Sequence, residues 1–490
     1  MITPAFEEAK KLTDYGVIPL KREILSDIRT PIEVLRILRN VSRHCYILES
    51  VENQEKWGRY TFLGYNPLLE ISCLNGELTV KNVHTGETET HQTTHPAEYI
   101  RELMNGYTSP KLPGFPSFTG GLVGYFGYDY IKYSEPCLRL DAKDEEHFKD
   151  VDLMLFDKVI AFDNIRQKII LITNISSENI EESYQKGVAE LDEMVRLIRE
   201  GTPAPVKKAH LKSEFRRLFS KEEYCGMVER AKKYIYEGDI FQVVLSNRLD
   251  ADFEGSLLDT YRILRTTNPS PYMFYFSSDD MEVAGASPET LVKLENGILH
   301  TFPLAGTRPR GKDDEEDKQL EKELLADEKE LSEHNMLVDL GRNDLGKISE
   351  FGSVEVEKYM SIERYSHVMH IGSTVRGRIR EGFSALDAVD AVLPAGTLSG
   401  APKIRACEII NELENNKRGI YGGAVGYIDF SGNLDTAIAI RLCFKKNGRV
   451  FVRSGAGIVA DSVPEKEYNE CINKAKAVVN ALELSKEGEL

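Results

Sequence analysis

The sequence lacks the segments that would place a protein in or across a membrane. The first twenty residues, MITPAFEEAKKLTDYGVIPL, alternate charged and apolar side chains and contain no continuous hydrophobic stretch, so they do not read as a secretory signal. No apolar run elsewhere is long enough to cross a bilayer. We therefore expect neither secretion nor membrane insertion.

Cysteine is scarce, and the usual signatures of a nucleophile are missing. The seven cysteines are odd in number, widely separated and never spaced as Cys-x-x-Cys, which argues against a disulfide framework and a thiolate zinc site. They favour a reducing compartment, and the cytoplasm is the expected location. Gly-x-Ser-x-Gly, Gly-x-Cys-x-Gly and the phosphate loop are all absent, so the sequence does not support nucleophilic hydrolysis.

The composition is that of an ordinary globular protein with an excess of acid. Apolar residues make up 41% and charged residues 29% of the 490 positions, and 79 acidic against 62 basic residues give a net charge of −17. Such a charge opposes non-specific binding to nucleic acid or to an anionic membrane. The length predicts at least two domains.

A break in composition divides the chain. Residues 199–215, REGTPAPVKKAHLKSEF, end a helical pattern with glycine and two prolines, and they predict a linker over 201–214 between an amino-terminal domain (1–200) and a larger domain (215–490). On both sides, β-branched and aromatic segments are joined by short turns such as KKNGR. We expect an α+β protein whose sheets are largely antiparallel.

Two predicted helices each carry a pair of carboxylates beside an apolar stripe. Glu330 and Glu333 lie three residues apart in KELSEHNMLVDLGRNDLGK, and Glu467 and Glu470 have the same spacing in PEKEYNECINKAKAVVNAL. Four such oxygen ligands suit a hard divalent cation such as Mg²⁺. Ordinary solvated helix carboxylates are the alternative.

For three further features, the local sequence is compatible with either a structural or a functional role. RSGAGIVADS, residues 453–462, predicts a glycine-rich turn between a strand and a helix, either structural or facing an anion. Arg441, within the apolar segment TAIAIRLCF, needs either a ligand carboxylate or an internal acid as partner. Glu289 follows a proline at the start of an element, where it could serve as a helix-cap carboxylate or as a general acid.

Long motifs in a fixed order carry a more specific signal. Eight segments within residues 215–485 resemble those of the chorismate-utilising enzymes, namely GDIFQVVLSNRL, NPSPYMFYF, GASPETLVK, PLAGTRPRG, KELSEHNMLVDLGRNDLGK, LPAGTLSGAPKIRACEIINELE, YGGAVGYIDFSGNLDTAIAIR and SGAGIVADSVPEKEYNECINKA. Upstream, CYILESVENQEKWGRYTFLGYNP resembles the family's amino-terminal domain. The resemblance implies a two-domain fold in which antiparallel sheets form a sandwich, with helices outside and the active site in a cleft of the larger domain.

The resemblance also assigns roles to particular positions. Glu333 and Glu470 match the family's Mg²⁺ ligands, with Glu330 and Glu467 in a supporting position. Glu289 and His370 match acid and base residues around the substrate ring, and Thr307 is placed with them. The positions that match chorismate-binding residues are Gly306, Thr307, Tyr421, Arg441, Gly455, Ala456 and Gly457.

Two positions separate the reactions found in this family. Relatives that add water carry a lysine base where this chain has Gln242, which disfavours isochorismate or salicylate synthesis. Relatives that form aminodeoxychorismate carry a nucleophilic lysine where this chain has Ala305. The resemblance thus implies a Mg²⁺-dependent lyase that converts chorismate and ammonia to anthranilate and pyruvate, the first step of tryptophan biosynthesis, with aminodeoxychorismate synthesis as the alternative.

The resemblance also implies regulation and a partner. Ser50, Pro271, Tyr272 and Met273 match a site at which tryptophan exerts feedback inhibition, although locally they could simply end a strand and form a turn. Ammonia would come from a separate glutamine amidotransferase subunit, in a heterotetramer of two subunits of each kind. A catalytically silent subunit that binds tryptophan and a partner is the contrasting hypothesis.

Overall fold

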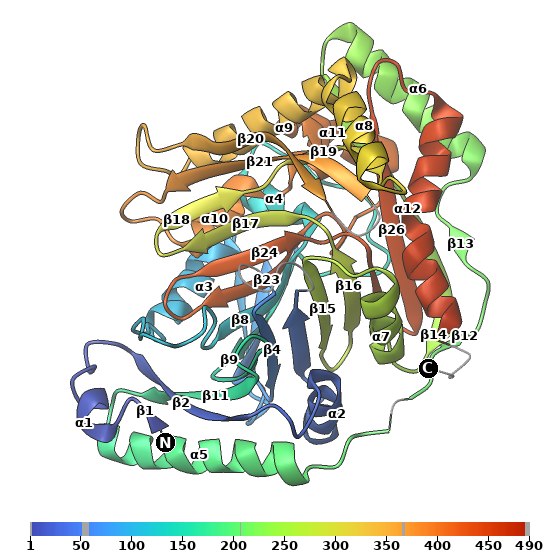
Figure 1. The fold of residues 1–490 in the computed structure, drawn as a ribbon. Coiled ribbons are helices and arrows are strands. Elements are labelled where there is room, and N and C mark those ends of the chain that lie inside the picture. The colour runs from blue at the N-terminus through green and yellow to red at the C-terminus, as the bar shows by residue number, and fades with distance from the viewer. Residues whose placement is uncertain (1, 51–57, 206, 365–367, 486–490) are drawn as a thin grey trace.

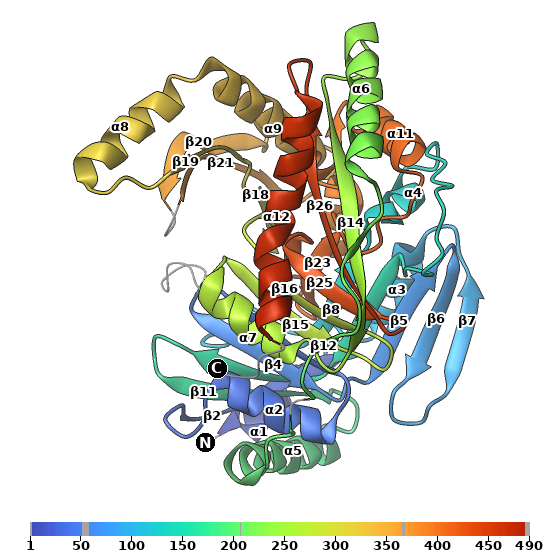
Figure 2. The same ribbon diagram turned by 90° about the vertical axis from the view of Figure 1, so that its right-hand side faces the viewer.

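Two large antiparallel sheets pack face to face with helices outside them, as Figures 1 and 2 show for this computed structural model. The structure describes residues 2–50, 58–205, 207–364 and 368–485. Within these residues every pair of neighbouring strands in the two sheets is antiparallel. The prediction of an α+β fold with an antiparallel sandwich and flanking helices is therefore confirmed.

The first sheet combines strands from both halves of the chain. In spatial order its path is β1 (Ile2–Thr3), β2 (Val17–Leu25), β11 (Lys168–Ser176), β10 (Lys158–Asp163), β4 (Tyr60–Tyr65), β3 (Cys45–Glu49), β15 (Tyr272–Ser277), β16 (Glu282–Ser287), β25 (Leu442–Lys446), β26 (Arg449–Ile458), β14 (Gln242–Glu254) and β12 (His210–Leu211), with β13 (Arg216–Arg217) and β22 (Gly400–Ala401) also paired to β14. The pairing of β3 with β15 joins the two halves.

The second sheet is built in the same mixed way. Its path is β19 (Leu304–Pro309), β21 (Val368–Arg378), β18 (Ile298–Thr301), β17 (Thr290–Glu295), β24 (Leu434–Ile438), β23 (Ala424–Asp429), β8 (Gly121–Phe126), β9 (Val151–Phe156), β5 (Leu69–Leu74), β6 (Glu77–Asn82) and β7 (Thr88–Gln92), and β20 (Glu355–Arg364) pairs with β21. The predicted division at 201–214 does not coincide with a boundary between the sheets, and it stays a prediction.

The helices cover the outer faces of the sandwich (Figures 1 and 2). They are α1 (Phe6–Ala9), α2 (Pro31–Val41), α3 (Pro96–Asn105), α4 (Ile131–Ser134), α5 (Ile180–Glu200), α6 (Lys221–Glu237), α7 (Leu258–Thr267), α8 (Asp314–Leu325), α9 (Glu328–Gly346), α10 (Ala385–Val392), α11 (Lys403–Glu414) and α12 (Pro464–Leu484), with short 3₁₀ turns at Tyr128–Tyr130 and Gly396–Leu398. No helix of the described chain is long and apolar enough to span a bilayer.

Aromatic side chains fill the space between the sheets. Tyr46 and Phe62 from the first sheet, with Tyr125 and Phe156 from the second, belong to one buried cluster, and the Tyr46 and Phe156 rings meet edge to face at 4.7 Å between centroids. All seven cysteines are free thiols, as their spacing predicted.

Local signals place the two helices on which the predicted metal site depends. Helix α9 starts where the Asp327 side chain accepts hydrogen bonds from the backbone N–H groups of Lys329 and Glu330, and α12 starts at Pro464. The apolar positions 468, 472, 475, 479 and 482 predict the buried stripe of α12. The helix buries 468, 475 and 482 as well as 471, 478 and 481, whereas 472 and 479 are only half-buried.

Candidate active site and a second pocket

A cavity of about 660 Å³ gathers most of the predicted site residues. Its walls come from α9, α12, β14, β19, β21 and β26, together with the segments that precede β17 and β25. Predicted residues that line it are Glu289, Gly306, Thr307, Glu330, Glu333, His370, Tyr421, Arg441, Gly455, Gly457, Glu467 and Glu470. They come from segments more than 180 positions apart in the sequence, so this grouping is a property of the tertiary structure.

Glu289 holds its carboxyl in the protein interior at the edge of this cavity. Thr397 Oγ1 donates a hydrogen bond to Glu289 Oε1 at 3.0 Å. Burial raises the pKa of Glu289 to about 7 from an ordinary 4.5, although the Thr397 hydrogen bond and the charge of Lys474 pull it down. A carboxyl with this pKa retains its proton for a substantial part of the time at neutral pH, as a general acid requires.

His370 is held as a neutral base by the strand opposite it. Its Nδ1 lies 2.9 Å from the Gly306 carbonyl oxygen and 3.0 Å from Thr307 Oγ1. A carbonyl only accepts, so Nδ1 carries the proton and donates, which fixes the tautomer. Burial lowers the pKa of His370 below 6.5 and keeps the ring neutral at pH 7.

Gly306 allows this contact because its backbone is left-handed, with φ of +64°. A Cβ at this position would come within 2.9 Å of Leu324 Cδ1 and 3.2 Å of Glu330 Oε2. A larger residue would therefore move either helix α8 or the acidic side chain away from the cavity.

The four predicted metal-site carboxylates face the same cavity from two helices. Burial and the neighbouring charge of Glu330 raise the pKa of Glu333, and burial and the charge of Glu470 raise the pKa of Glu467. Gln242 Nε2 donates to Glu333 Oε1 at 3.4 Å, and Lys474 forms an ion pair with Glu470 at 2.7 Å. The contacts from Gln242 and Lys474 offset only part of the repulsion among the four carboxylates.

This donor set fits a hard divalent cation. All four groups offer carboxylate oxygens, and burial together with a neighbouring acid raises the pKa of two of them, Glu333 and Glu467. The four do not converge on one point: in the described residues, the one group of three or more candidate ligand atoms within 4.8 Å of one another lies elsewhere. A cation held here would need water or substrate oxygens as further ligands.

Arg441 departs from its predicted setting. It does not lie inside a strand, because β24 ends at Ile438 and β25 begins at Leu442, and its backbone is left-handed with φ of +54°. Its Nη1 donates to the backbone oxygen of Lys474 in α12 at 2.6 Å. In the described chain no carboxylate forms an ion pair with it, and burial lowers its pKa, so a ligand carboxylate would complete its hydrogen bonding.

The glycine-rich turn predicted at residues 453–462 is wrong in its first half. Residues up to Ile458 continue β26, because they stay hydrogen-bonded to the neighbouring strand β14. The chain turns only after Ile458. Alternation along the strand puts Gly455 and Gly457 on the cavity side, whereas the Ala456 side chain is fully buried against the core under α6 and α11. Ala456 thus does not line the cavity with its side chain.

Gly457 leaves room for a neighbouring amide. A Cβ at Gly457 would lie 2.7 Å from Gln242 Nε2, so only glycine lets Gln242 extend across β26 toward Glu333. Ala305, the other position that separates the family's reactions, also lines the cavity. No amine therefore occupies either of the two places where relatives are expected to carry a lysine.

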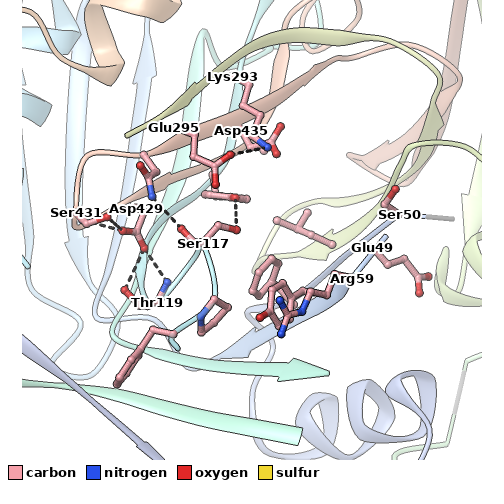
Figure 3. Close-up of a pocket in the computed structure, with 18 of the residues that line it drawn as sticks. Glu49, Ser50, Arg59, Ser117, Thr119, Lys293, Glu295, Asp429, Ser431 and Asp435 are labelled. Carbon is pink, nitrogen blue, oxygen red and sulfur yellow. Dashed lines mark hydrogen bonds and ion pairs between the residues drawn. The ribbon is translucent and has the colours of Figure 1, made fainter. Parts of the chain in front are cut away.

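A second cavity, of about 460 Å³, holds every residue of the predicted tryptophan site. Ser50, Pro271, Tyr272 and Met273 line it at the paired ends of β3 and β15, and Figure 3 shows the polar side chains around it. The Ser50 hydroxyl is buried and has no hydrogen-bond partner in the described chain. A buried hydroxyl without a partner costs free energy unless a ligand supplies the missing hydrogen bond.

Sequence reasoning missed several cavity residues. Lys474 forms an ion pair with Glu470 and its Nζ donates to the Gly455 oxygen at 3.2 Å, but a lysine four residues after a glutamate reads as an exposed helix pair. Thr397 lies in the 3₁₀ turn Gly396–Leu398, and no local pattern marked it as a site residue. In the second cavity, Arg59 and Tyr427 were also missed.

Comparison with known proteins agrees with this arrangement. Residues 43–480 match the family model described as chorismate binding enzyme. The chain is 45% identical to anthranilate synthase component 1 of Acetivibrio thermocellus, with 99% of each chain covered, and 46% identical to that of Aquifex aeolicus, again with 99% of each covered.

Solved structures show the same architecture. The crystal structure of anthranilate synthase component I from Streptococcus pneumoniae matches with a TM-score of 0.77 and 40% identity over 93% of this chain and 98% of that one. The menaquinone-specific isochorismate synthase from Escherichia coli matches with a TM-score of 0.69 over 98% and 99% of the two chains. At 19% identity the second match speaks for the fold alone.

Proposed function

The chain belongs to the chorismate-binding enzymes, and from this premise we propose that it converts chorismate and ammonia to anthranilate, pyruvate and water. The observation that carries the proposal is the first cavity, which is lined by a carboxyl with a pKa of about 7, a neutral histidine and an arginine that has no carboxylate partner among the described residues. The names of the full-length relatives support the same reaction.

Glu289 would act in the first step. Ammonia adds at the ring 2-position of chorismate while the 4-hydroxyl leaves, and the leaving oxygen needs a proton to depart as water. Glu289 is the cavity carboxyl with a pKa near neutrality, so it is our candidate donor. Thr397 orients its carboxyl through the hydrogen bond to Oε1.

Arg441 would bind a substrate carboxylate. Its guanidinium is anchored through one nitrogen to α12 and has further donors available for a planar anion. Lys474, which faces the same cavity, adds positive charge beside the predicted ring site. Holding both reactants in one orientation contributes to the rate in its own right.

Glu333 and Glu470 would hold Mg²⁺, with Glu330 and Glu467 nearby. When bound, the ion would neutralise these acids and hold a substrate carboxylate as a Lewis acid. The carboxylate chemistry of the four donors and the raised pKa values of Glu333 and Glu467 support this assignment.

His370 would assist the second step. Loss of pyruvate breaks the bond between the ring and the enolpyruvyl oxygen, removes a ring proton and leaves an aromatic ring, and the enolpyruvyl group takes up a proton as it leaves as pyruvate. With Nδ1 donating to Gly306, the ring's second nitrogen is the basic one in the neutral form. A lowered pKa keeps this base ready at pH 7.

The choice of product rests on Gln242 and Ala305. A neutral amide hydrogen-bonded to Glu333 cannot deprotonate water, and alanine cannot form the covalent intermediate expected of relatives that make aminodeoxychorismate. Anthranilate is therefore the favoured product.

We also propose feedback inhibition by tryptophan at the second cavity. The buried Ser50 hydroxyl, which has no partner in the part of the chain that the structure describes, can form a hydrogen bond with a ligand, and the cavity walls include Tyr272 and Met273. Tyr272 Oη lies 3.0 Å from Thr290 Oγ1, and Thr290 directly follows Glu289 in the chain. A ligand that shifts Tyr272 therefore has a short physical route to the candidate acid.

Ammonia would be supplied by a glutamine amidotransferase subunit. The relatives' designation as component 1 supports a partner, and the sequence carries no Gly-x-Cys-x-Gly turn of its own. Free ammonium at high concentration should replace that partner. The free state of all seven cysteines accords with the expected reducing compartment, the cytoplasm.

The decisive test is direct. The purified chain is incubated with chorismate, Mg²⁺ and excess ammonium at alkaline pH, with and without tryptophan, and the product is identified by fluorescence and mass. Anthranilate that disappears with tryptophan supports the whole proposal. Aminodeoxychorismate or isochorismate would overturn the interpretation of Ala305 or Gln242, and tryptophan binding without turnover would indicate a silent regulatory subunit.

A further inference from the structure

One histidine and two carboxylates meet at a place that neither cavity uses. His44 directly precedes β3, Glu70 lies in β5, and Asp279 lies in the turn between β15 and β16. His44 Nε2 is 3.6 Å from Glu70 Oε2 and 3.9 Å from Asp279 Oδ2. The three ligand atoms lie within 4.8 Å of one another.

The histidine nitrogen at the centre of this group is an orphan. His44 is only 5% exposed, and its Nε2 is buried without a hydrogen-bond partner in the described residues. The backbone of His44 is fixed, since its carbonyl oxygen accepts from Ser42 Oγ at 3.0 Å and from the Asn66 N–H at 3.1 Å. A buried, positioned and unsatisfied imidazole nitrogen facing two carboxylates is a common arrangement of a metal ligand.

We propose that His44, Glu70 and Asp279 form a binding site for a Zn²⁺-sized divalent transition metal. Bonds of about 2.0–2.2 Å to nitrogen and oxygen place tetrahedral ligands roughly 3.3–3.6 Å apart. The observed separations from His44 Nε2 are 3.6 and 3.9 Å, so small side-chain movements would close the set. The exposed side of Asp279 leaves the fourth position to water.

In the structure, Lys81 pairs with both carboxylates of this group. Lys81 Nζ lies 2.8 Å from Asp279 Oδ2 and 3.8 Å from Glu70 Oε2, the same oxygen atoms that face His44. Lys149 and Arg43 are each 4.0 Å from one of the two acids. Because the Lys81 side chain is 34% exposed, it can turn into solvent when a metal takes its place.

The site would fasten the two sheets together. His44 and Asp279 lie just beyond the paired ends of β3 and β15 in the first sheet, whereas Glu70 belongs to the second. Metal bound only by the folded chain should therefore raise the melting temperature. The competing explanation is a closed ion-pair network in which Lys81 is the permanent cation.

Zinc titration of the metal-stripped full chain against a chromophoric chelator separates these explanations. We expect one equivalent bound, and visible absorption of a tetrahedral type when Co²⁺ replaces Zn²⁺. His44→Asn should weaken binding at least ~10-fold and abolish that absorption, since even partners that merely orient a ligand contribute about that much. Lys81→Gln should tighten binding, because it removes the competing ammonium.

Controls isolate the site from other metal-binding groups. His91→Asn removes a half-buried histidine that also lies 3.6 Å from a glutamate, Glu89, and it should leave zinc binding unchanged. Repeating the titration in Glu333→Gln excludes the first cavity as the source. Asp279→Asn, in an exposed turn, decides the matter if His44→Asn does not fold. Equal zinc affinity in wild type, Asp279→Asn and His44→Asn, or no binding by wild type, would overturn the proposal.

Discussion

The two cavities differ in how far the protein satisfies their polar groups. In the first, burial and, to a smaller extent, repulsion from a neighbouring acid raise the pKa values of Glu333 and Glu467, and Arg441 has no carboxylate partner in the described chain. In the second, burial also raises the pKa values of Asp429 and Asp435, but these acids have hydrogen-bond donors: the N–H groups of Thr119 and Ser431 donate to Asp429 (Figure 3), and Tyr272 donates to Asp435. Arg59 pairs with Asp163.

This difference accords with the proposed roles. A site that stabilises changing charge benefits from groups that the resting protein leaves unbalanced, because a substrate or transition state can then complete them. A regulatory site needs only to bind, so it can have its polar groups largely satisfied by the protein, with the Ser50 hydroxyl left without a partner among the described residues. Substitutions in each cavity test whether the contrast is real.

The largest effect is expected at the acidic pair. Glu333→Gln or Glu470→Gln should lower kcat/KM by at least ~1000-fold and remove its Mg²⁺ dependence, since a bound metal contributes several kcal/mol to such a reaction. Steady-state kinetics across Mg²⁺ concentrations measures this. Glu328→Gln, on an exposed position of the same helix, is the matched control. Near-normal activity in both cavity variants would remove the metal assignment.

Glu289→Gln should lower kcat by about 100- to 1000-fold, the usual contribution of a general acid, while circular dichroism stays unchanged. In the wild type, kcat/KM expressed per free ammonia should fall as pH rises above about 7, where Glu289 loses its proton. This alkaline limb should be absent in the variant. Its persistence would assign the limb to another group.

The same substitution should stabilise the protein at high pH. The pKa of Glu289 is raised on folding, so the folded state holds a proton that the unfolded state releases, and stability falls as pH rises from 4.5 to about 7. The shift corresponds to about 3 kcal/mol of unfolding free energy. Urea unfolding at pH 5 and pH 8 should show that Glu289→Gln gains on wild type only at pH 8.

A smaller, selective effect is expected at Ser50. Removing its hydroxyl should raise the inhibition constant for tryptophan by about tenfold, the equivalent of one hydrogen bond, and leave uninhibited turnover unchanged. Because the hydroxyl has no partner among the described residues, Ser50→Ala should not lower the melting temperature. Unchanged inhibition would show that tryptophan binds elsewhere. Ser183→Ala, on α5, serves as the control.

The smallest effect is expected at Ser117, in the same cavity. Its hydroxyl already pairs with Tyr427 Oη at 3.3 Å, so Ser117→Ala should alter inhibition by about threefold or less and cost up to ~1 kcal/mol of stability. The comparison with Ser50→Ala is the informative measurement. If both variants behave alike, an unsatisfied hydroxyl is not what marks the tryptophan site.

The sequence alone predicted the antiparallel α+β fold, the two helices with their carboxylate pairs, and the family. These are local properties: the i, i+3 spacing of Glu330 and Glu333, the turn residues between strands, and contiguous motifs are all legible along the chain. The break at 201–214 is equally legible, yet strands from both sides of it enter both sheets.

Only the tertiary structure decided the environment of each group. The pKa of Glu289 depends on burial and on Thr397, 108 positions away, and the tautomer of His370 depends on Gly306 across a strand pair. The alternation of side chains along β26 directs Ala456 toward the core, and Arg441 lies outside a strand because β24 ends at Ile438. Solvation, charge pairing and side-chain direction are set by atoms that distant segments contribute, and no local pattern records which segments will meet.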